Sequence, residues 1–418
     1  MRDAQRALIR SSFVNRVGSG LFNATSTLYF TRVVHLPAAE VGAGLTIAGL
    51  VGLLAGVPVG HLADRYGPRL VTLLTLCIQA GTMASFVLVR SWAAFTLLAT
   101  LDLLAASANN ASRGALIARV GGDQPAVFRA RLRNYVNLGL LLGTVGAAVA
   151  IQVGSRSAYT ALILVNTASY LIGAMLLLRV PGYAPLPADG GTRNPLRALA
   201  DRPFLAVSAL NGAMGLQYQV VALLLPIWIS SYTDAPRWTV AAVYGCNAAL
   251  CIALQVRIGS TVETIRQGGH AFRRAGVVFL LSCPLMALAA DVPRWEAVTL
   301  LLIAVCVHSV GEVLHSSAGF VLGFGLAPDH AQGQYQGLVG LGFDAGQAVA
   351  PAFLTGVCLA LGQWGWLLLG ALLAVLGLLG PPVAGWAGRS RPADRPADCQ
   401  APVSAPSAVP GQAEASSG

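Results

Sequence analysis

The sequence predicts an all-α polytopic membrane protein with twelve transmembrane helices arranged as two sets of six. Hydrophobic residues make up 55% of the 418 residues and charged residues only 11%, and the mean hydropathy is +0.66. A soluble core of this length cannot bury that much apolar material. The apolar runs are long and continuous, close to the roughly 20 residues that a spanning helix needs. A β-barrel would instead show alternating segments of about ten residues.

Twelve apolar runs account for the expected helices in chain order. The first six lie at residues 12–33, 41–61, 70–89, 92–114, 134–154 and 158–178. The second six lie at residues 203–230, 238–257, 275–291, 297–323, 337–360 and 364–386. We therefore expect an N-terminal half at residues 1–178 and a C-terminal half at 203–387. Residues 179–202 are rich in proline, glycine and arginine, which is typical of a linker, here a cytoplasmic one. Residues 388–418 contain few large apolar side chains and predict a disordered cytoplasmic tail.

The arginines predict the orientation of the chain in the membrane. No lysine occurs, so all 27 basic residues are arginine. If the N-terminus is cytoplasmic, 20 of them fall in cytoplasmic segments, five outside and two within spans. The positive-inside rule therefore places both termini in the cytoplasm. The net charge of +10 is mostly this topology signal, and no basic water-exposed domain suggests binding to nucleic acid. The abundance of alanine, glycine, proline and arginine is typical of a GC-rich bacterial genome, so we expect a multi-pass protein of the bacterial cytoplasmic membrane.

A short charged segment separates the second and third apolar runs. It spans Gly60 to Arg69, GHLADRYGPR, and resembles the loop between helices 2 and 3 of the major facilitator superfamily, of the form G-x-L-x-D-R-x-G-x-R. The resemblance implies two six-helix halves related by an axis along the membrane normal. It also implies that Asp64, with Arg65 and Arg69, latches the cytoplasmic side of the halves through helix 11, in which Asp344 lies. The alternatives are that the segment only determines topology, and that Asp344 stabilises the start of its helix.

Charged and polar residues inside the spans are candidates for function, because a charge at the bilayer centre costs roughly 2.5 to 3.5 kcal/mol and needs a cavity or a partner. In helix 4 they recur at i, i+7 and i+11, and in helix 10 at i, i+4 and i+7, so each set shares one helical face. In the superfamily that this chain resembles, the first and fourth helices of each half line the cavity. The candidates for proton coupling or for the substrate cavity are Arg16, Asn23, Asp102, Asn109, Arg113, Tyr218, His308, Glu312 and His315.

Several of these residues have a second interpretation. Asp102 and Glu312 either carry protons or bind a cationic substrate, or they are buried struts in salt bridges or hydrogen bonds. Arg16 is a possible partner of Asp102 across helices 1 and 4. His308 and His315 either relay protons beside Glu312 or satisfy backbone carbonyls.

The resemblance implies a secondary transporter, and we expect proton-coupled efflux of small hydrophobic or amphipathic molecules by alternating access. The alternative is an uptake symporter for a nutrient or small organic anion held by Arg16 and Arg113. The glycine-rich signature of drug antiporters is incomplete in helix 5, because Gly139 and Gly143 are kept but Thr144 replaces the proline. No nucleophile elbow, metal-ligand spacing or Walker sequence indicates an enzyme, a metal site or a cofactor. The expected partners are the substrate, protons and lipid, and the expected state is monomeric.

Overall fold

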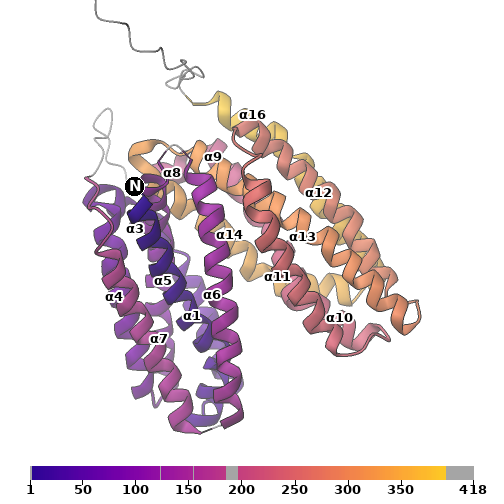
Figure 1. Ribbon diagram of the computed structural model, residues 1–418, viewed down its shortest axis with the longest axis horizontal. Helices are drawn as coiled ribbons and strands as arrows, with labels where there is room; N and C mark the ends of the chain where they lie inside the picture. The colour runs from indigo at the N-terminus through magenta and orange to yellow at the C-terminus, as the bar shows by residue number, and fades with distance from the viewer. Residues whose placement is uncertain (1, 123, 154, 185–195, 392–418) are drawn as a thin grey trace, which may run out of the picture.

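The computed structural model describes residues 2–122, 124–153, 155–184 and 196–391, and within these ranges the regular structure is helical. The expected linker at 179–202 is described only at its two ends. Most of the expected tail at 388–418 lies outside the described residues. Figure 1 shows the long helices gathered in two groups, indigo to magenta for the first half of the chain and pink to yellow for the second.

The first group contains the segments expected as spans one to six. Their bounds are α1 (Arg2–Leu28) continued by η1 (Tyr29–Val33), α2 (Ala38–Gly52), α3 (Gly56–Tyr66), α4 (Pro68–Ser85) with η2 (Phe86–Leu88), α5 (Trp92–Val120), α6 (Pro125–Val153) and α7 (Arg156–Leu177). The helices α2 and α3 together make one span that is bent by 46°. A proline begins α4 and another begins α6, as expected for a residue whose missing N–H is not needed in the first turn.

The second group follows the short helix α8 (Arg197–Ala200). Its bounds are α9 (Arg202–Met214), η3 (Gly215–Gln217), η4 (Val220–Leu224), α10 (Leu225–Tyr232), α11 (Trp238–Gly259), α12 (Ile265–Leu288), α13 (Arg294–Gly325), η5 (Asp329–Ala331), α14 (Gln332–Phe353), η6 (Leu354–Leu359), α15 (Gln363–Leu378) and α16 (Gly380–Arg389). Three of its spans combine consecutive elements: Arg202–Tyr232, Asp329–Leu359 and Gln363–Arg389.

Among the described residues, nine helices are long and apolar enough to cross a membrane, and the bent pair α2–α3 makes a tenth. The two remaining long helices, α1 and α6, match them in length. Helix α1 is rich in arginine, asparagine and serine, and α6 has three arginines near its start. They pack against each other, and α1 also packs against α7. The architecture is therefore consistent with the twelve predicted helices, although only ten of them meet a length and hydropathy test among the described residues.

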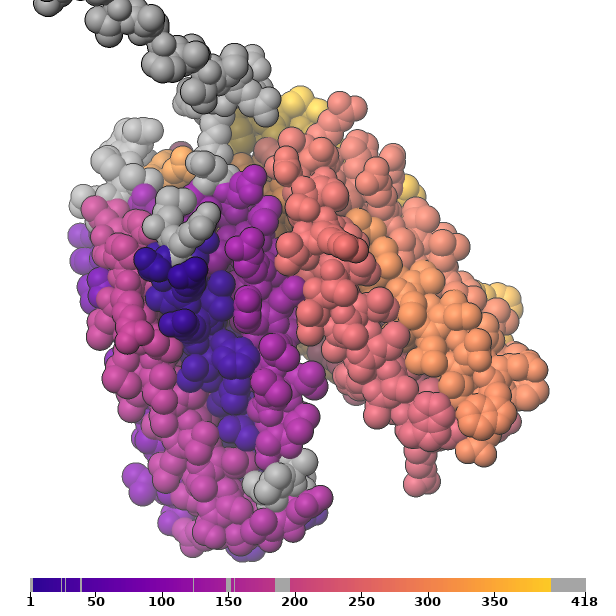
Figure 2. Space-filling view, in the orientation of Figure 1, coloured from indigo at the N-terminus to yellow at the C-terminus, as the bar shows by residue number. Residues whose placement is uncertain are grey.

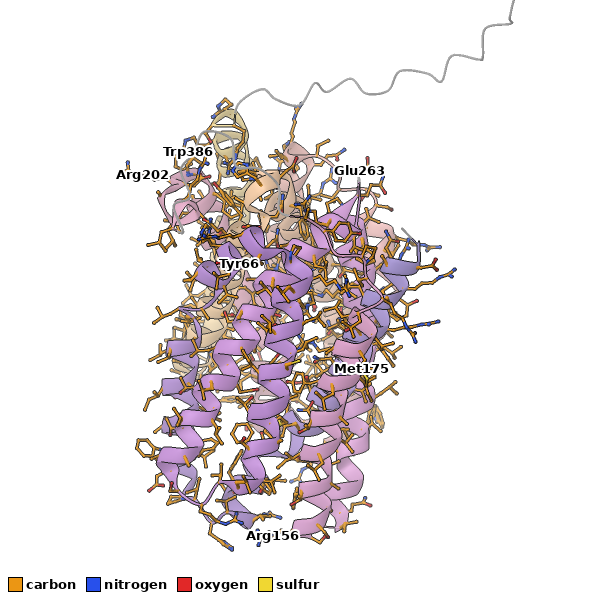
Figure 3. The ribbon with its side chains drawn as sticks, turned by 90° about the vertical axis from the view of Figure 1, so that its left-hand side faces the viewer. Tyr66, Arg156, Met175, Arg202, Glu263 and Trp386 are labelled. Atoms are coloured by element: carbon orange, nitrogen blue, oxygen red, sulfur yellow. The ribbon has the colours of Figure 1, made fainter. Side chains whose placement is uncertain are left out.

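The surface of the helices suits a lipid environment. Large apolar side chains such as Leu54, Leu88 and Met175 are exposed. Figure 3 shows Met175 part-way along the helices, with Arg202 and Glu263 toward one end and Arg156 at the other. Apolar side chains on the outside and charges at both ends are what a spanning bundle requires.

The two groups meet near the end that carries the N-terminus and diverge toward the opposite end (Figure 1), which leaves the wedge seen between them in the space-filling view (Figure 2). Helix α14 of the second group packs against α3 and α5 of the first, and α6 of the first packs against α11 and α13 of the second. The molecule is thus closed at one end and open at the other.

Glycines allow the backbones to approach closely at several helix crossings. A Cβ added at Gly143 would overlap the carbonyl oxygen of Val17, and one at Gly20 would overlap that of Leu140. The glycines of the expected helix 5, which is α6, therefore pack closely against α1. Helix α14 has glycines on two faces, because Gly333 and Gly337 meet the α3 backbone whereas Gly342 and Gly346 meet that of α9.

Candidate functional site

Asp64 joins the two groups of helices at their closed end. Its two carboxylate oxygens accept hydrogen bonds from the backbone N–H of Gly333 at 2.7 Å and of Gln334 at 3.0 Å. These amides belong to the first turn of α14, where N–H groups have no partner within the helix and the helix dipole favours a negative charge. The contact therefore links α3 to α14 through a charge-assisted pair of hydrogen bonds.

Two glycines of the Gly60–Arg69 segment explain how this contact is reached. A Cβ at Gly60 would overlap the backbone of Gly333, so only glycine lets the two helices approach. Gly67 has φ +94° and ends α3, a conformation that residues with a side chain rarely adopt. Most of the segment, expected as a loop, is the last part of α3, and the turn is confined to Gly67.

The other residues expected in the latch lie elsewhere. The guanidinium of Arg65 lies 5.3 Å from the ring of Tyr66, and Arg69 donates to the carbonyl of Leu178 at 2.7 Å. Asp344 lies about three turns into α14. It lines the central cavity instead, and the expected stabilisation by the start of its helix does not apply at that depth.

A cavity of about 270 Å³ lies between the two groups of helices. Five predicted site residues line it, and they come from α1, α5, the η3–η4 region, α13 and α14: Arg16, Arg113, Tyr218, His315 and Asp344. Aromatic and aliphatic side chains complete the wall, among them Phe320, Phe324, Phe343, Leu132 and Val339. The cavity thus combines fixed charges with apolar surface, as small-molecule sites do.

Among the described residues, one ion pair joins the two groups of helices beside the cavity. Arg133 of α6 lies 3.1 Å from Oε1 of Glu312 in α13, donates to the Tyr218 hydroxyl at 2.9 Å and lies 4.9 Å from the centre of its ring. The second Glu312 oxygen accepts from the Asn247 side chain at 3.1 Å. Glu312 thus contacts Arg133 of the first group of helices and Asn247 of its own group.

Sequence reasoning missed Arg133, and with it Arg129, which also lines the cavity. The apolar run of helix 5 begins at residue 134, so the sequence alone predicts both arginines in the preceding cytoplasmic segment. In the structure α6 begins at Pro125, so these arginines lie within the helix. The proline was the available signal, since it is over-represented at the first position of helices.

The two histidines of α13 are fully buried and hydrogen-bonded through both ring nitrogens. His308 contacts the backbone carbonyl of Gln217 at 3.3 Å and the Ser282 hydroxyl at 3.3 Å. His315 contacts the backbone carbonyl of Asn211 at 3.3 Å and the Gln217 side chain at 3.4 Å. This geometry fits the interpretation of the histidines as struts between α13 and the α9–η3 span.

The predicted polar stripe of helix 4 does not face the central cavity as a unit. Asp102 accepts a hydrogen bond from Thr82 at 3.1 Å, and Asn109 donates to Thr75 at 2.9 Å, so both face α4. With Asn23, Asp102 lines a separate cavity of about 300 Å³ within the first group. No ion pair joins Asp102 to Arg16 among the described residues. Of the stripe, only Arg113 reaches the central cavity.

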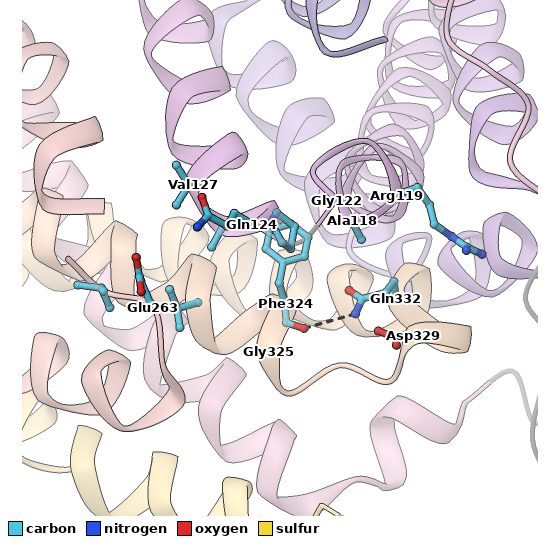
Figure 4. A pocket seen from close by; sticks show the side chains of 14 residues that line it. Ala118, Arg119, Gly122, Gln124, Val127, Glu263, Phe324, Gly325, Asp329 and Gln332 are labelled. Carbon is cyan, nitrogen blue, oxygen red and sulfur yellow. Dashed lines mark hydrogen bonds between the residues drawn. The ribbon is translucent and has the colours of Figure 1, made fainter. Parts of the chain in front are cut away.

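A larger cavity, about 700 Å³, lies at the closed end beside the start of α6 (Figure 4). Glu263 lies across it from Gln124 and Val127, and Gln332 donates to the carbonyl of Phe324 at 3.4 Å. Glu263 follows Gly259 by four residues, as Asp64 follows Gly60. At the closed end the helices are in close contact where α3 meets α14, whereas the cavity of about 700 Å³ separates them beside the start of α6.

The comparisons with known proteins agree with this architecture. The family model of the Major Facilitator Superfamily matches residues 8–351. The chain belongs to the Major Facilitator Superfamily. As a member, it is a multi-pass membrane transporter. A likeness in fold is seen with the crystal structure of a bacterial homologue of the iron transporter ferroportin in the outward-facing state, at 15% sequence identity and a TM-score of 0.72, covering 92% of this chain and 99% of that one.

Relatives of this superfamily transporter include proteins named for drug resistance. The multidrug resistance protein MdtH of Enterobacter sp. (strain 638) is 24% identical, and the match covers 83% of this chain and 85% of MdtH. The uncharacterized MFS-type transporter YttB of Bacillus subtilis (strain 168) is also 24% identical, with 84% and 88% covered. The similarity extends over most of each chain.

Proposed function

We propose that this protein is a proton-coupled exporter of small amphipathic molecules, acting as a monomer in the bacterial cytoplasmic membrane. The observation that carries the proposal is the Arg133–Glu312 pair, which joins the two groups of helices beside the central cavity. The name of MdtH supports export of drug-like molecules. In this proposal the moving bodies are residues 1–178 and 203–387, joined by a linker at 179–202.

The arginine distribution supports a cytoplasmic position for the closed end. On that orientation the conformation described is open to the outside, with the Asp64 contact holding the cytoplasmic side shut. A proton from outside reaches Glu312 through the wedge between the halves. Protonation removes the negative charge that Arg133 pairs with, which weakens the link between the halves and promotes the change of conformation. Each charge moved across 100 mV supplies about 2.3 kcal/mol, so no nucleotide is needed.

Transport in vesicles of both orientations tests the proposal. Inverted vesicles with an acid interior should accumulate an amphipathic dye such as 1-anilinonaphthalene-8-sulfonate or N-phenyl-1-naphthylamine, and a protonophore should abolish the accumulation. Glu312→Gln vesicles should keep dye binding but lose the response to the pH gradient. Equal accumulation in inverted vesicles with and without the protein would contradict export.

A second candidate, uptake by symport with protons, is favoured by one specific feature. Protonation of Glu312 would leave Arg133 as an unpaired cation in the cavity, so a proton and an anion would bind better together than apart. A carrier that binds the proton and the anion better together than apart is suited to moving both across the membrane in the same direction. Accumulation of the sulfonate dye in right-side-out vesicles with an acid exterior, and none in inverted vesicles, would favour this candidate.

A further inference from the structure

The central cavity contains more positive than negative charge. Four guanidinium groups line it, from α1, α5 and α6: Arg16, Arg113, Arg129 and Arg133. The acids available to them are Asp344, which also lines the cavity, and Glu312, whose ion pair is with Arg133 alone. Among the described residues Arg16, Arg113 and Arg129 have no ion pair with any carboxylate.

These three arginines also lack most of the hydrogen bonds that a guanidinium can donate. Arg113 is only 9% exposed, and its one side-chain hydrogen bond within the described part of the chain is to Asn110 at 2.9 Å. The Nε atoms of Arg113 and Arg16 are buried without a partner among the described residues. Arg129 has a ring contact with Phe320, at 5.8 Å from its centre, and no hydrogen bond to a described residue. Arg113 is buried, and Arg16 and Arg129 are half-buried. Charges withdrawn from water are normally paired, so this arrangement calls for a counter-ion.

The chemistry of the lining indicates which counter-ion fits. The planar guanidinium donates two parallel hydrogen bonds to a carboxylate, sulfonate or phosphate group. Beside the arginines lie Phe320, Phe343 and Val339, which offer apolar and aromatic surface. The volume of about 270 Å³ accommodates a molecule the size of a bicyclic aromatic acid and is too small for a lipid with two acyl chains.

We infer that the central cavity binds an amphipathic organic anion, with the acidic group among Arg16, Arg113 and Arg129 and the apolar body against Phe320 and Phe343. This inference rests on the proposed function in one respect: it takes the cavity between the halves as the transport site. Export of such an anion in exchange for a proton moves two charges in the direction that an inside-negative potential drives. The membrane potential thus assists the export of an anion more than that of a neutral molecule.

Binding of three naphthalene compounds to the purified protein tests the inference. Naphthalene-2-sulfonate, its neutral isostere naphthalene-2-sulfonamide and the cation 2-naphthylmethylammonium differ mainly in charge. We expect the sulfonate to bind at least tenfold more tightly than the other two in calorimetric titrations. Arg113→Gln should weaken sulfonate binding about 10- to 100-fold and leave sulfonamide binding unchanged.

Two further variants separate loss of the anion site from misfolding: one removes another cavity arginine, and the other is a control outside the cavity. Arg129→Gln removes a side chain that makes no hydrogen bond to a described residue, so it should fold normally and still weaken sulfonate binding. Arg156→Gln removes an exposed charge far from the cavity and should change nothing. Equal affinity for all three compounds, or equal loss in all three variants, would overturn the anion site. Sulfonate-selective binding without transport in vesicles would instead refute the proposed export and leave the anion site standing.

Discussion

The contact between Asp64 and the start of α14 predicts how the Asp64→Asn variant behaves. Both carboxylate oxygens accept backbone hydrogen bonds, at 2.7 and 3.0 Å, and a hydrogen bond to a charged group contributes about 1.5 to 3 kcal/mol. Asparagine keeps one acceptor oxygen but loses the charge and the second acceptor. We therefore expect the closed end to lose about 2 to 3 kcal/mol of stabilisation, which shifts the population toward opening at that end about 30- to 150-fold.

Distances between spin labels measure this shift. Labels at Tyr66 and Ser260, which are exposed on the two groups of helices at the closed end, should show a longer distance in Asp64→Asn, in a background without the native cysteines. Transport should slow, because the variant returns less often to the closed state, while substrate affinity stays nearly unchanged. The matched control is Glu263→Gln, since this exposed acid makes no side-chain hydrogen bond or ion pair to a described residue. Identical distance distributions and turnover in the wild type and Asp64→Asn would refute the reasoning.

The remaining predictions concern three other features of the fold. Gly60→Ala should lower the initial rate of dye transport at least tenfold, because its Cβ overlaps Gly333, whereas Gly81→Ala, with nothing within 4 Å of the added Cβ, should not. Gly143→Leu should lower the melting temperature of the detergent-solubilised protein by forcing α1 and α6 apart, and an unchanged melting temperature would refute this. His308→Gln should likewise reduce thermal stability but leave the pH profile of transport unchanged, and an altered profile would point to a proton relay instead.

The spanning helices follow from local signals in the sequence, whereas the contact of Asp64 with helix 11 is implied only by the resemblance of the Gly60–Arg69 segment. Long apolar runs are sufficient to place spanning helices. The segment around Asp64 combines a glycine that permits close approach, an acid for a helix start and a second glycine for the turn. The sequence displays these residues, but their partner at the start of α14 follows only from the resemblance and not from the residues themselves.

The central cavity was harder to predict because it depends on where a helix begins and how it is rotated. The apolar run at 134–154 leaves out Arg129 and Arg133, because charged residues before an apolar run look the same whether or not the helix includes them. One residue turns a helix by about 100°, which is why Asn110 lines the cavity while Asn109 faces α4. Rotation of this kind is set by contacts with neighbouring helices, not by the stripe itself.

The glycines on two faces of α14 have a mechanical consequence. Where Gly333, Gly337, Gly342 and Gly346 meet α3 and α9, no side chains interlock as ridges and grooves do in ordinary helix pairs. Smooth backbone surfaces can slide or tilt past each other without the repacking that larger residues would impose. Only the face with Gly333 and Gly337 lies against the other half. We therefore expect α14 to tilt or slide against α3 there during transport, and a bulky residue on that face should block the movement.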